Sequence, residues 1–196
     1  MKQKRKKRHQ KKSWIGKGLF LLFLIGIIAS MAFLFKREII HTLGPFLDQW
    51  NILGEKKEIV LYFSDREGEY LIGEKRGISK RDKVNEEAKE AVIELIKGPK
   101  EKLTPTLPSR TKLLTFQLDE KGVAKVNFSR ALSKDHPGGS SAEIMTTYSI
   151  VNSLTLNFPQ IKRVQILVEG RAIETIAGHL SLKQPLSSNP DLVRRQ

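Results

Sequence analysis

A short polar stretch, KDHPGGSSAE from Lys134 to Glu143, holds the residue types that acyl-transfer chemistry uses. His136 could act as a general base, Ser140 or Ser141 as a nucleophile, and the glycine pair as an oxyanion cradle. Such chemistry also needs a third group to orient the base, and the stretch lacks a Gly-x-Ser-x-Gly elbow. Ser140 and Glu143 instead match the S-x-x-E capping box, in which each side chain satisfies a backbone N–H near the other. The stretch therefore predicts a loop that enters a helix, and the protein is not expected to be an enzyme.

The remaining side chains that could do chemistry are scattered along the chain. The other three histidines share no metal-ligand spacing with one another or with His136, and there is no cysteine. We therefore expect no metal centre and no cofactor. A hydrolase that uses His136 or His179 stays as an alternative. An acidic loop leaves calcium binding open, although it lacks the fixed spacing of a calcium motif. The loop residues are Asp65, Glu67 and Glu69, and the other histidines are His9, His41 and His179.

The strong positive charge belongs to one end of the chain. The formal net charge is +14, yet residues 1–37 hold eleven Lys and Arg and no acidic residue. Residues 38–196 are nearly balanced, with 24 basic and 21 acidic side chains. Aromatic residues are not interleaved with the basic ones, as they are in many nucleic-acid-binding surfaces. The composition thus excludes a nucleic-acid partner for the body of the protein.

Residues 18–35 read GLFLLFLIGIIASMAFLF and carry no charge. As a helix they would extend about 27 Å, close to the thickness of a bilayer core. Basic residues crowd the preceding segment, so the positive-inside rule keeps residues 1–17 in the cytoplasm. The sequence predicts one transmembrane anchor over 18–36 and a juxtamembrane linker over 37–57. The rest would lie outside the bacterial inner (cytoplasmic) membrane. Cleavage as a signal peptide stays open as an alternative.

The body alternates between strand and helix periods. Apolar residues at spacings of three and four predict two amphipathic helices, and the alternating segments between them predict hairpins. The expected fold class is α/β (α+β), with a mixed sheet of about five to six strands covered by two helices. In the second helix we expect the polar positions Thr146, Asn152 and Ser153 to face outward as contacts. A disordered tail is expected over 187–196. The expected strands are 58–63, 69–79, 113–118, 123–128 and two within 163–176 around Glu169-Gly170, and the expected helices are 84–97 and 141–158.

Six short motifs occur in one order along residues 58–186: ELIKGP, LP, GVAKVNFS, IVNSLT, VQILVEG and GHLSLKQPL. With these motifs the chain resembles the GerMN domain family of bacterial sporulation and germination. The resemblance implies one extracytoplasmic α/β domain that packs against proteins and turns over no substrate. The chain departs from the family at Asn127, where an aspartate is common, and it has one copy of the domain. The family positions expected to be structural are Gly98, Pro99, Pro108, Gly122, Ser129, Asn152, Pro159, Gly170, Gly178 and His179.

Together these features predict a membrane-anchored, non-catalytic interaction module in a bacterial envelope or sporulation- or germination-type assembly. Its expected partners are the membrane, other envelope proteins or further copies of itself. The alternative is a module that binds a cell-wall polymer or another anionic ligand through a basic surface. That surface would comprise Lys75, Arg76, Lys80, Arg81 and Lys83.

Overall fold

The computed structural model describes residue 20, residues 22–27, residue 30 and residues 55–194. The chain divides into two compact units, Met1–Gly54 and Glu55–Gln196. The predicted cytoplasmic tail, most of the linker and much of the predicted anchor lie outside the described residues. Within the described ranges, the structure contains no helix that is long and apolar enough to cross a membrane.

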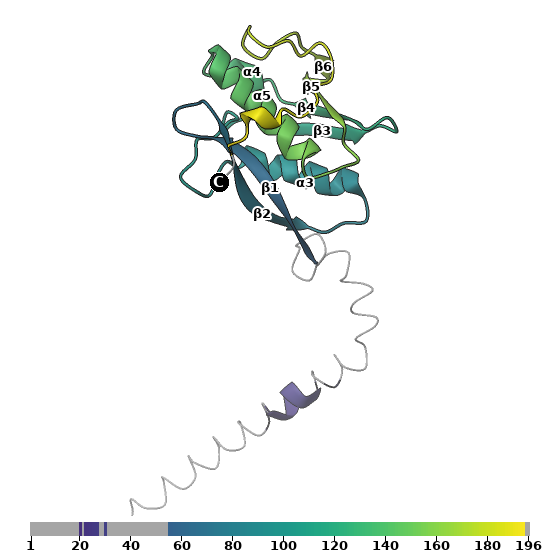
Figure 1. The fold of residues 1–196 in the computed structure, drawn as a ribbon. Coiled ribbons are helices and arrows are strands. Elements are labelled where there is room, and N and C mark those ends of the chain that lie inside the picture. The colour runs from purple at the N-terminus through teal and green to yellow at the C-terminus, as the bar shows by residue number, and fades with distance from the viewer. Residues whose placement is uncertain (1–19, 21, 28–29, 31–54, 195–196) are drawn as a thin grey trace, which may run out of the picture. The chain divides into compact units, whose positions relative to one another are not determined.

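Residues 55–194 form an α+β domain whose elements follow the predicted order (Figure 1). Two strands come first, then a helix, a second pair of strands, a long helix and the last strands. The elements are β1 (Lys56–Ser64), β2 (Leu71–Ser79), α3 (Val84–Ile96), β3 (Leu113–Leu118), β4 (Val123–Phe128), α4 (Ala131–Lys134), α5 (Ser140–Thr155), β5 (Arg163–Val168), β6 (Arg171–Ala172) and the 3-10 turn η1 (Pro190–Leu192).

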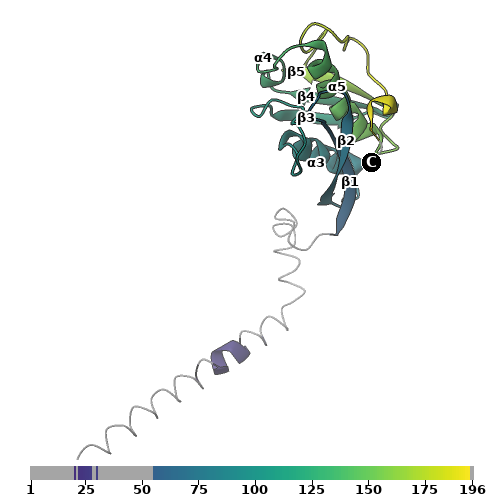
Figure 2. The ribbon, with the colours of Figure 1, turned by 60° about the vertical axis from the view of Figure 1, so that its left-hand side comes forward.

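Strands β1 and β2 pair as an antiparallel hairpin that comes forward in the turned view of Figure 2. Because side chains alternate along a strand, one face of β1 presents Ile59, Leu61 and Phe63, all buried. Ile78 of β2 joins them on that face, since it lies opposite Lys57 in the register. The predicted strand pair is therefore confirmed, and its apolar face contributes to the core.

The second sheet has the order β3-β4-β5-β6. β4 and β5 are parallel, joined by the crossover helix α5, while the other pairs are antiparallel. Its apolar rows face the helices; one of them runs Phe116, Val126 and Ile166 across three strands. The predicted hairpin turn before β4 is confirmed at Gly122, whose φ of 77° suits glycine.

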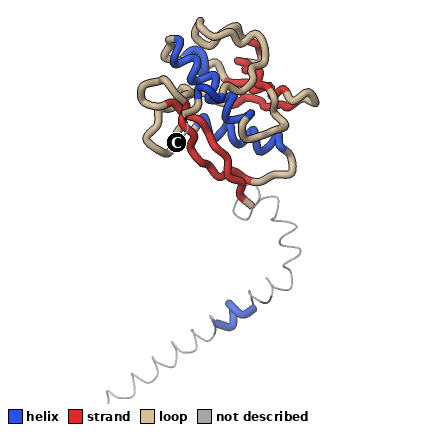
Figure 3. The backbone as a smooth tube through the Cα atoms, in the orientation of Figure 1, coloured by secondary structure: helices blue, strands red, loops and turns tan. Residues whose placement is uncertain are grey.

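Helices α3 and α5 lie between the hairpin and the four-stranded sheet, as Figure 3 shows. α3 contacts both hairpin strands and β3, whereas α5 contacts β1 and β5. The prediction of one mixed sheet with five to six strands is therefore wrong. The strands form two sheets because the helices bury apolar surface on both sides, and no strand of one sheet reaches an edge of the other.

The outer edge of β1 is closed by side chains of α5 where another strand could have paired. Asn157, just beyond the helix, accepts a hydrogen bond from the N–H of Val60 (2.8 Å) and donates to its C=O (2.6 Å). Ser153 accepts from the N–H of Tyr62 (3.0 Å), and Ser149 donates to its C=O (2.6 Å). These three polar residues recur every fourth position, so they form one stripe on the helix. The stripe replaces a strand in satisfying the backbone of β1.

Truncating Asn157 to alanine should lower the free energy of unfolding by about 2–4 kcal/mol, because it leaves both backbone groups of Val60 without their partners. Asn157→Asp should also destabilise the domain, since aspartate keeps the acceptor for the N–H but loses the donor to the C=O. Urea denaturation of the full chain measures both values. A loss below about 0.5 kcal/mol in Asn157→Ala would contradict the assigned role of this residue.

Polar residues of α5 and the C-terminal segment pack into the domain, contrary to what the sequence predicts. Thr146, Asn152 and Ser153, expected to face outward, are all at most 2% exposed. Residues 187–194, expected to be part of a disordered tail, are bound to the domain. Asn152 exchanges two hydrogen bonds of 2.9 Å with the backbone of Asn189, and the Arg194 N–H donates to the C=O of Leu71. Asn152 is therefore buried with the tail as its partner, whereas Thr146 donates to the C=O of Thr106 and Ser153 accepts from the N–H of Tyr62.

Candidate functional site

The stretch from Lys134 to Glu143 is the loop and helix start that the sequence predicts, but its details differ. Gly139 is the N-cap of α5, and no side chain caps the helix. The predicted capping box is therefore wrong. The Ser141 hydroxyl donates to the C=O of Gly68 at 2.7 Å, which fastens α5 to the hairpin turn. Gly138 and Gly139 both have φ near +85°, so the turn requires residues without a Cβ.

Both ring nitrogens of His136 are engaged in the fold. Nδ1 accepts the N–H of Gly138 at 3.0 Å, and Nε2 lies 3.0 Å from the Thr146 hydroxyl. That hydroxyl donates its own proton to the C=O of Thr106 at 2.5 Å, so Nε2 must be the donor in the His136–Thr146 bond. The imidazole is thus neutral and protonated on Nε2. Burial lowers the pKa of His136, and the nearby Glu143 carboxylate offsets only part of that effect.

This histidine should make the stability of the domain fall at mildly acidic pH. The unfolded chain takes up a proton on His136 near pH 6.5, whereas the folded chain resists it. The contribution is therefore complete above pH 6.5 and is lost as the pH falls through the lowered pKa. Urea denaturation at pH 7.5 and pH 5.5 should show a larger loss in the wild type than in His136→Gln. The matched control, His179→Gln at an exposed position, should keep the loss of the wild type.

Glu143 is fully buried and holds the loop before residue 180. Its Oε1 accepts the N–H groups of Ile176 (2.7 Å) and Ala177 (2.9 Å), and its Oε2 accepts that of His179 (2.7 Å). Burial by itself would raise the pKa of Glu143, but the backbone N–H donors outweigh it and the pKa is lowered. The carboxylate is therefore a structural anion enclosed by backbone amides. The family position His179 lies in this loop: its backbone N–H is bound by Glu143, and the residue is exposed.

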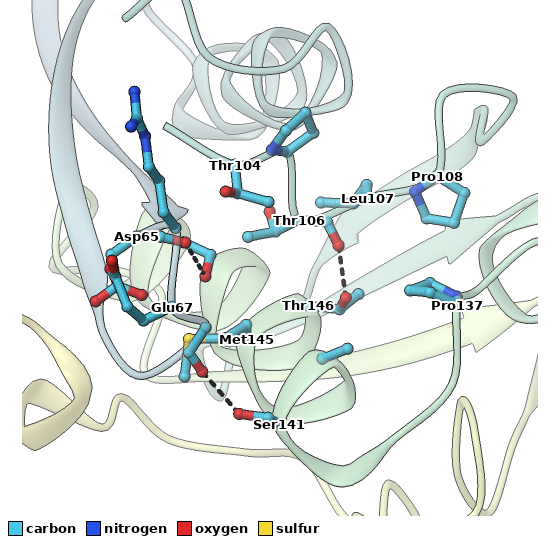
Figure 4. A pocket seen from close by; sticks show the side chains of 15 residues that line it. Asp65, Glu67, Thr104, Thr106, Leu107, Pro108, Pro137, Ser141, Met145 and Thr146 are labelled. Carbon is cyan, nitrogen blue, oxygen red and sulfur yellow. Dashed lines mark hydrogen bonds between the residues drawn. The ribbon is translucent and has the colours of Figure 1, made fainter. Parts of the chain in front are cut away.

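A cavity of about 420 Å³ opens beside the start of α5 (Figure 4). The hairpin turn, the loop after α3 and the first turns of α5 form its walls. Much of the wall is apolar, and proline rings give it a rigid shape. The lining residues are Ser64, Asp65, Arg66, Glu67, Gly68, Thr104, Pro105, Thr106, Leu107, Pro108, Pro137, Ser141, Ala142, Met145 and Thr146.

Most of the hydroxyls around this cavity form hydrogen bonds within the protein. Thr106 and Ser149 share a hydrogen bond of 2.6 Å. Thr146 and Ser141 donate to backbone carbonyls, and dashed lines in Figure 4 mark these two bonds. None of the fifteen lining residues is a histidine or a cysteine. The cavity can therefore accept a small group, but its lining offers no nucleophile paired with a base.

The acidic loop contributes to this wall but gathers no cation site. Asp65 Oδ1 accepts the N–H of Glu69 at 2.9 Å, a short turn within the loop. Asp65 Oδ2 lies 3.8 Å from the guanidinium of Arg194. Within residues 55–194 and the described helical residues before them, no group of three or more Asp, Glu, His or Cys is placed to hold a metal ion.

The predicted basic surface is divided by the fold. Arg76 is buried, 3% exposed, so it offers no contact to a ligand. Lys75 and Lys80 are exposed, and each forms an ion pair of 2.9 Å, with Glu58 and Glu55 respectively. Arg81 is half-buried, and Lys83 precedes α3 at the surface. The five residues therefore make no continuous positive face, although Lys75, Lys80 and Lys83 are exposed.

Most of the family positions lie in turns or in the core. Gly98 ends α3 with a φ of 84°, as the sequence predicts, and Pro99 follows it. A Cβ on Gly122 would lie 2.8 Å from the C=O of Gln160, so this turn has no room for a side chain. At the departure from the family, the Asn127 side chain accepts the N–H of Gly170 at 2.7 Å. The remaining positions are Pro108 in the cavity wall, Ser129 after β4, Asn152 in α5, Pro159 after α5, and Gly178 and His179 in the loop held by Glu143.

Sequence reasoning missed the buried charges and amides that hold the elements together. Glu74, Glu143 and Asn157 each bind backbone groups that lie at least 26 residues away along the chain. Glu74 lies in a strand between Gly73 and Lys75, and neither neighbour indicates that the Glu74 side chain is buried. The available signal was the recurrence of Ser149, Ser153 and Asn157 at every fourth position, which puts three polar side chains in one row.

The comparisons with known proteins agree on the domain. A family model described as "Germane: Sporulation and spore germination" matches residues 60–174. A protein of Clostridium perfringens that is described as a lipoprotein has a similar structure, with 25% identity and a TM-score of 0.50. The match covers 73% of this chain and 95% of that one. A search of curated proteins finds no match.

Two solved structures of the sporulation protein GerM from Bacillus subtilis share the fold. Its first GerMN domain aligns with 18% identity and a TM-score of 0.50, covering 68% of this chain and 96% of that one. Its tandem GerMN domains give a TM-score of 0.52 at 18% identity, covering 68% of this chain and 46% of that one.

Proposed function

The chain belongs to the Germane family of sporulation and spore germination domains, and from this we propose that it is a membrane-anchored, non-catalytic interaction module. Its domain would pack against protein partners, or against further copies of itself, in a bacterial envelope or sporulation- or germination-type assembly. The engagement of His136 carries the non-catalytic part of this proposal. A base whose two nitrogens are both bound within the fold is poorly placed to take a proton from a nucleophile.

The other reactive side chains support the same proposal. The Ser141 hydroxyl donates its hydrogen bond to the Gly68 carbonyl, and the Glu143 carboxylate accepts hydrogen bonds from backbone N–H groups. Each of these groups stabilises the fold, so the stretch that resembled a catalytic motif has a structural use. A hydrolase would need at least one of them to be released on substrate binding.

Membrane attachment rests on the sequence of residues 18–36 and on the basic residues before them. The C. perfringens protein of similar structure is described as a lipoprotein, a class that is held at a membrane by a lipid. This chain has no cysteine to carry such a lipid, so the apolar segment would serve as its anchor. The N-terminus would be cytoplasmic and the domain extracytoplasmic.

A wall polymer or other anionic ligand is the less favoured partner. Its recognition would need the basic surface, from which Arg76 is removed by burial and in which Lys75 and Lys80 face carboxylates. Exposed ion pairs are weak, so these lysines could still meet an anion, but the local charge is largely balanced.

The test is to crosslink a C-terminally tagged full chain in intact cells and purify it from membranes. We expect a repeatable protein partner or a ladder of self-crosslinks by mass spectrometry. Protease added to cells from which the wall and any outer membrane have been removed should cut the tagged domain, because the domain is proposed to lie outside the cytoplasmic membrane. A monomer that carries only polymer or lipid adducts, or a protein recovered in the cytoplasm, would overturn the proposal.

A further inference from the structure

The outer edge of β2 has unpaired backbone groups in an alternating pattern. In an antiparallel pair, the N–H and C=O of successive residues point in turn toward the partner strand and away from it. On β1, Tyr62 and Val60 point away from β2, because α5 side chains bind their backbone groups. Their register partners on β2, Gly73 and Lys75, must therefore also point outward. Gly77 continues this alternation.

Both ends of this edge are occupied, which confirms the alternation independently. At one end, the C=O of Leu71 accepts the N–H of Arg194, in a parallel bridge between Leu71 and Val193. At the other end, the N–H of Ser79 donates to the carboxylate of Glu90 at 3.0 Å. Between them, the N–H and C=O groups of Gly73, Lys75 and Gly77 have no hydrogen-bond partner within the described residues.

The outer edges of β1 and β3 carry protecting features that β2 lacks between Gly73 and Gly77. α5 covers β1 along Val60 and Tyr62. β3 carries an irregularity between Leu113 and Thr115, and the N–H of Leu118 is bound by Asn85. Bulges and covering side chains are the usual means by which proteins close a sheet edge. The open edge of β2 is therefore a template on which an extended segment can add as a third strand.

We propose that this edge, Gly73 to Gly77, binds an extended segment of a protein partner as an antiparallel third strand. The inference rests on the proposed function, because it names the surface and the kind of partner that the interaction module uses. Three outward residues supply six backbone groups, so the segment spans about five residues. The tail at Leu71 limits the added strand on one side, and the bond from Ser79 limits it on the other.

The side chains beside the edge define the sequence that fits. Lys75 is exposed at the centre and already pairs with Glu58 across the hairpin, so an acidic residue opposite it would extend a favourable charge row. Gly73 and Gly77 present no side chain, and Tyr62 and Val60 lie against Gly73. A bulky residue opposite Gly73 would pack against these two side chains, and one opposite Gly77 would cover the bare backbone there. The partner segment that fits therefore has an acidic residue opposite Lys75 and bulky residues two positions before and after it, with any residue in between.

A second copy of the same edge fits less well. Two β2 strands that pair antiparallel through all three residues would place Lys75 directly opposite its own copy, and like charges at such positions are destabilising. A partner with a complementary strand is thus favoured over a symmetric dimer.

The test uses the full chain in detergent and an acetylated peptide amide, Thr-Val-Thr-Glu-Thr-Val-Thr, with Glu→Lys and Glu→Gln peptides as controls. Free protein should exchange the amide hydrogens of Gly73, Lys75 and Gly77 quickly, and the peptide should slow all three. The variant Lys75→Pro removes an outward N–H together with the Lys75 ammonium group, so the hairpin should persist while the peptide affinity falls at least about tenfold. Lys75→Met keeps the N–H and should lose only about two- to fivefold.

Charge reversal keeps the inference testable if Lys75→Pro disturbs the fold. Lys75→Glu should prefer the Glu→Lys peptide over the original, by about two- to fivefold. The inference is overturned if the three amides are already protected in the free protein, or if Lys75→Pro binds the peptide as the wild type does. Concentration-dependent dimerisation that protects the same amides without peptide would also overturn it in favour of a second copy.

The same variants separate this inference from the proposed function. A cellular partner captured equally by wild type and by Lys75→Pro would leave the interaction module standing and reject this edge as its surface. Capture of no partner by the wild type would reject the module instead, whatever the peptide does. A captured partner counts in support only if it contains the five-residue pattern and loses capture when its acidic residue is reversed.

Discussion

Replacing Glu143 by alanine is expected to lower the free energy of unfolding by about 4–6 kcal/mol, enough to unfold many domains of this size. The change removes the acceptor of the buried N–H of Ile176 and of the partly buried N–H groups of Ala177 and His179, and it leaves a hole beside α5. Each orphaned buried donor costs about 1–3 kcal/mol. Urea denaturation of the full chain gives the value. Ser140→Ala, in the same helix turn but exposed, serves as the control and should change stability by less than about 0.5 kcal/mol.

Glu143→Gln separates the charge from the shape of this side chain. Glutamine keeps one acceptor oxygen but places an NH₂ group among N–H donors, so we expect a smaller loss of about 2–3 kcal/mol. Because the folded pKa of Glu143 is lowered, its contribution is complete above pH 4.5 and is lost as the pH falls. Stability should therefore depend less on pH below 4.5 in Glu143→Gln than in the wild type. If Glu143→Gln keeps both the wild-type urea midpoint and the wild-type dependence of stability on acidic pH, the role assigned to this carboxylate is rejected.

Removing Arg76 is expected to cost about 3–5 kcal/mol, because it leaves the buried carboxylate of Glu74 without its cation. The guanidinium contacts Glu74 at 2.5 Å, Glu94 at 3.2 Å and the C=O of Gly98 at 2.8 Å. Arg76→Met keeps the apolar stem but removes these bonds and the guanidinium that lies over the Phe63 ring. Lys75→Met, the neighbouring exposed lysine with its own ion pair, should lie within about 1 kcal/mol of the wild type.

A double substitution tests the origin of that loss. Burial alone would raise the pKa of Glu74, but the N–H of Glu101, the Arg76 guanidinium and the N–H of Lys100 together lower it. Once Arg76 is gone, the charge on Glu74 is no longer compensated. Arg76→Met with Glu74→Gln should therefore be more stable than Arg76→Met alone, since the amide oxygen still serves the two N–H donors. A double variant that is less stable than the single one would show that the loss arises elsewhere, for example from packing on Phe63.

The sequence by itself determined the elements and their order. Apolar spacing along α3, and the cap at Gly98, fixed the first helix, because local periodicity and glycine's access to positive φ act within a few residues. Alternation and turn residues fixed the hairpins for the same reason. Six motifs in one order were enough to identify the family, which the match over residues 60–174 shows.

Only the tertiary structure decided the partners of polar residues. Thr146 and Arg76 look like surface residues in the sequence, yet both are buried, because groups remote in the chain satisfy them. The same is true of Asn157, whose partner Val60 lies 97 residues away. Local sequence shows which residues are polar and how they are spaced. Whether such a residue is buried depends on whether another element of the fold supplies its hydrogen bonds. The division into two sheets and the open edge of β2 follow from such pairings, which local sequence patterns do not encode.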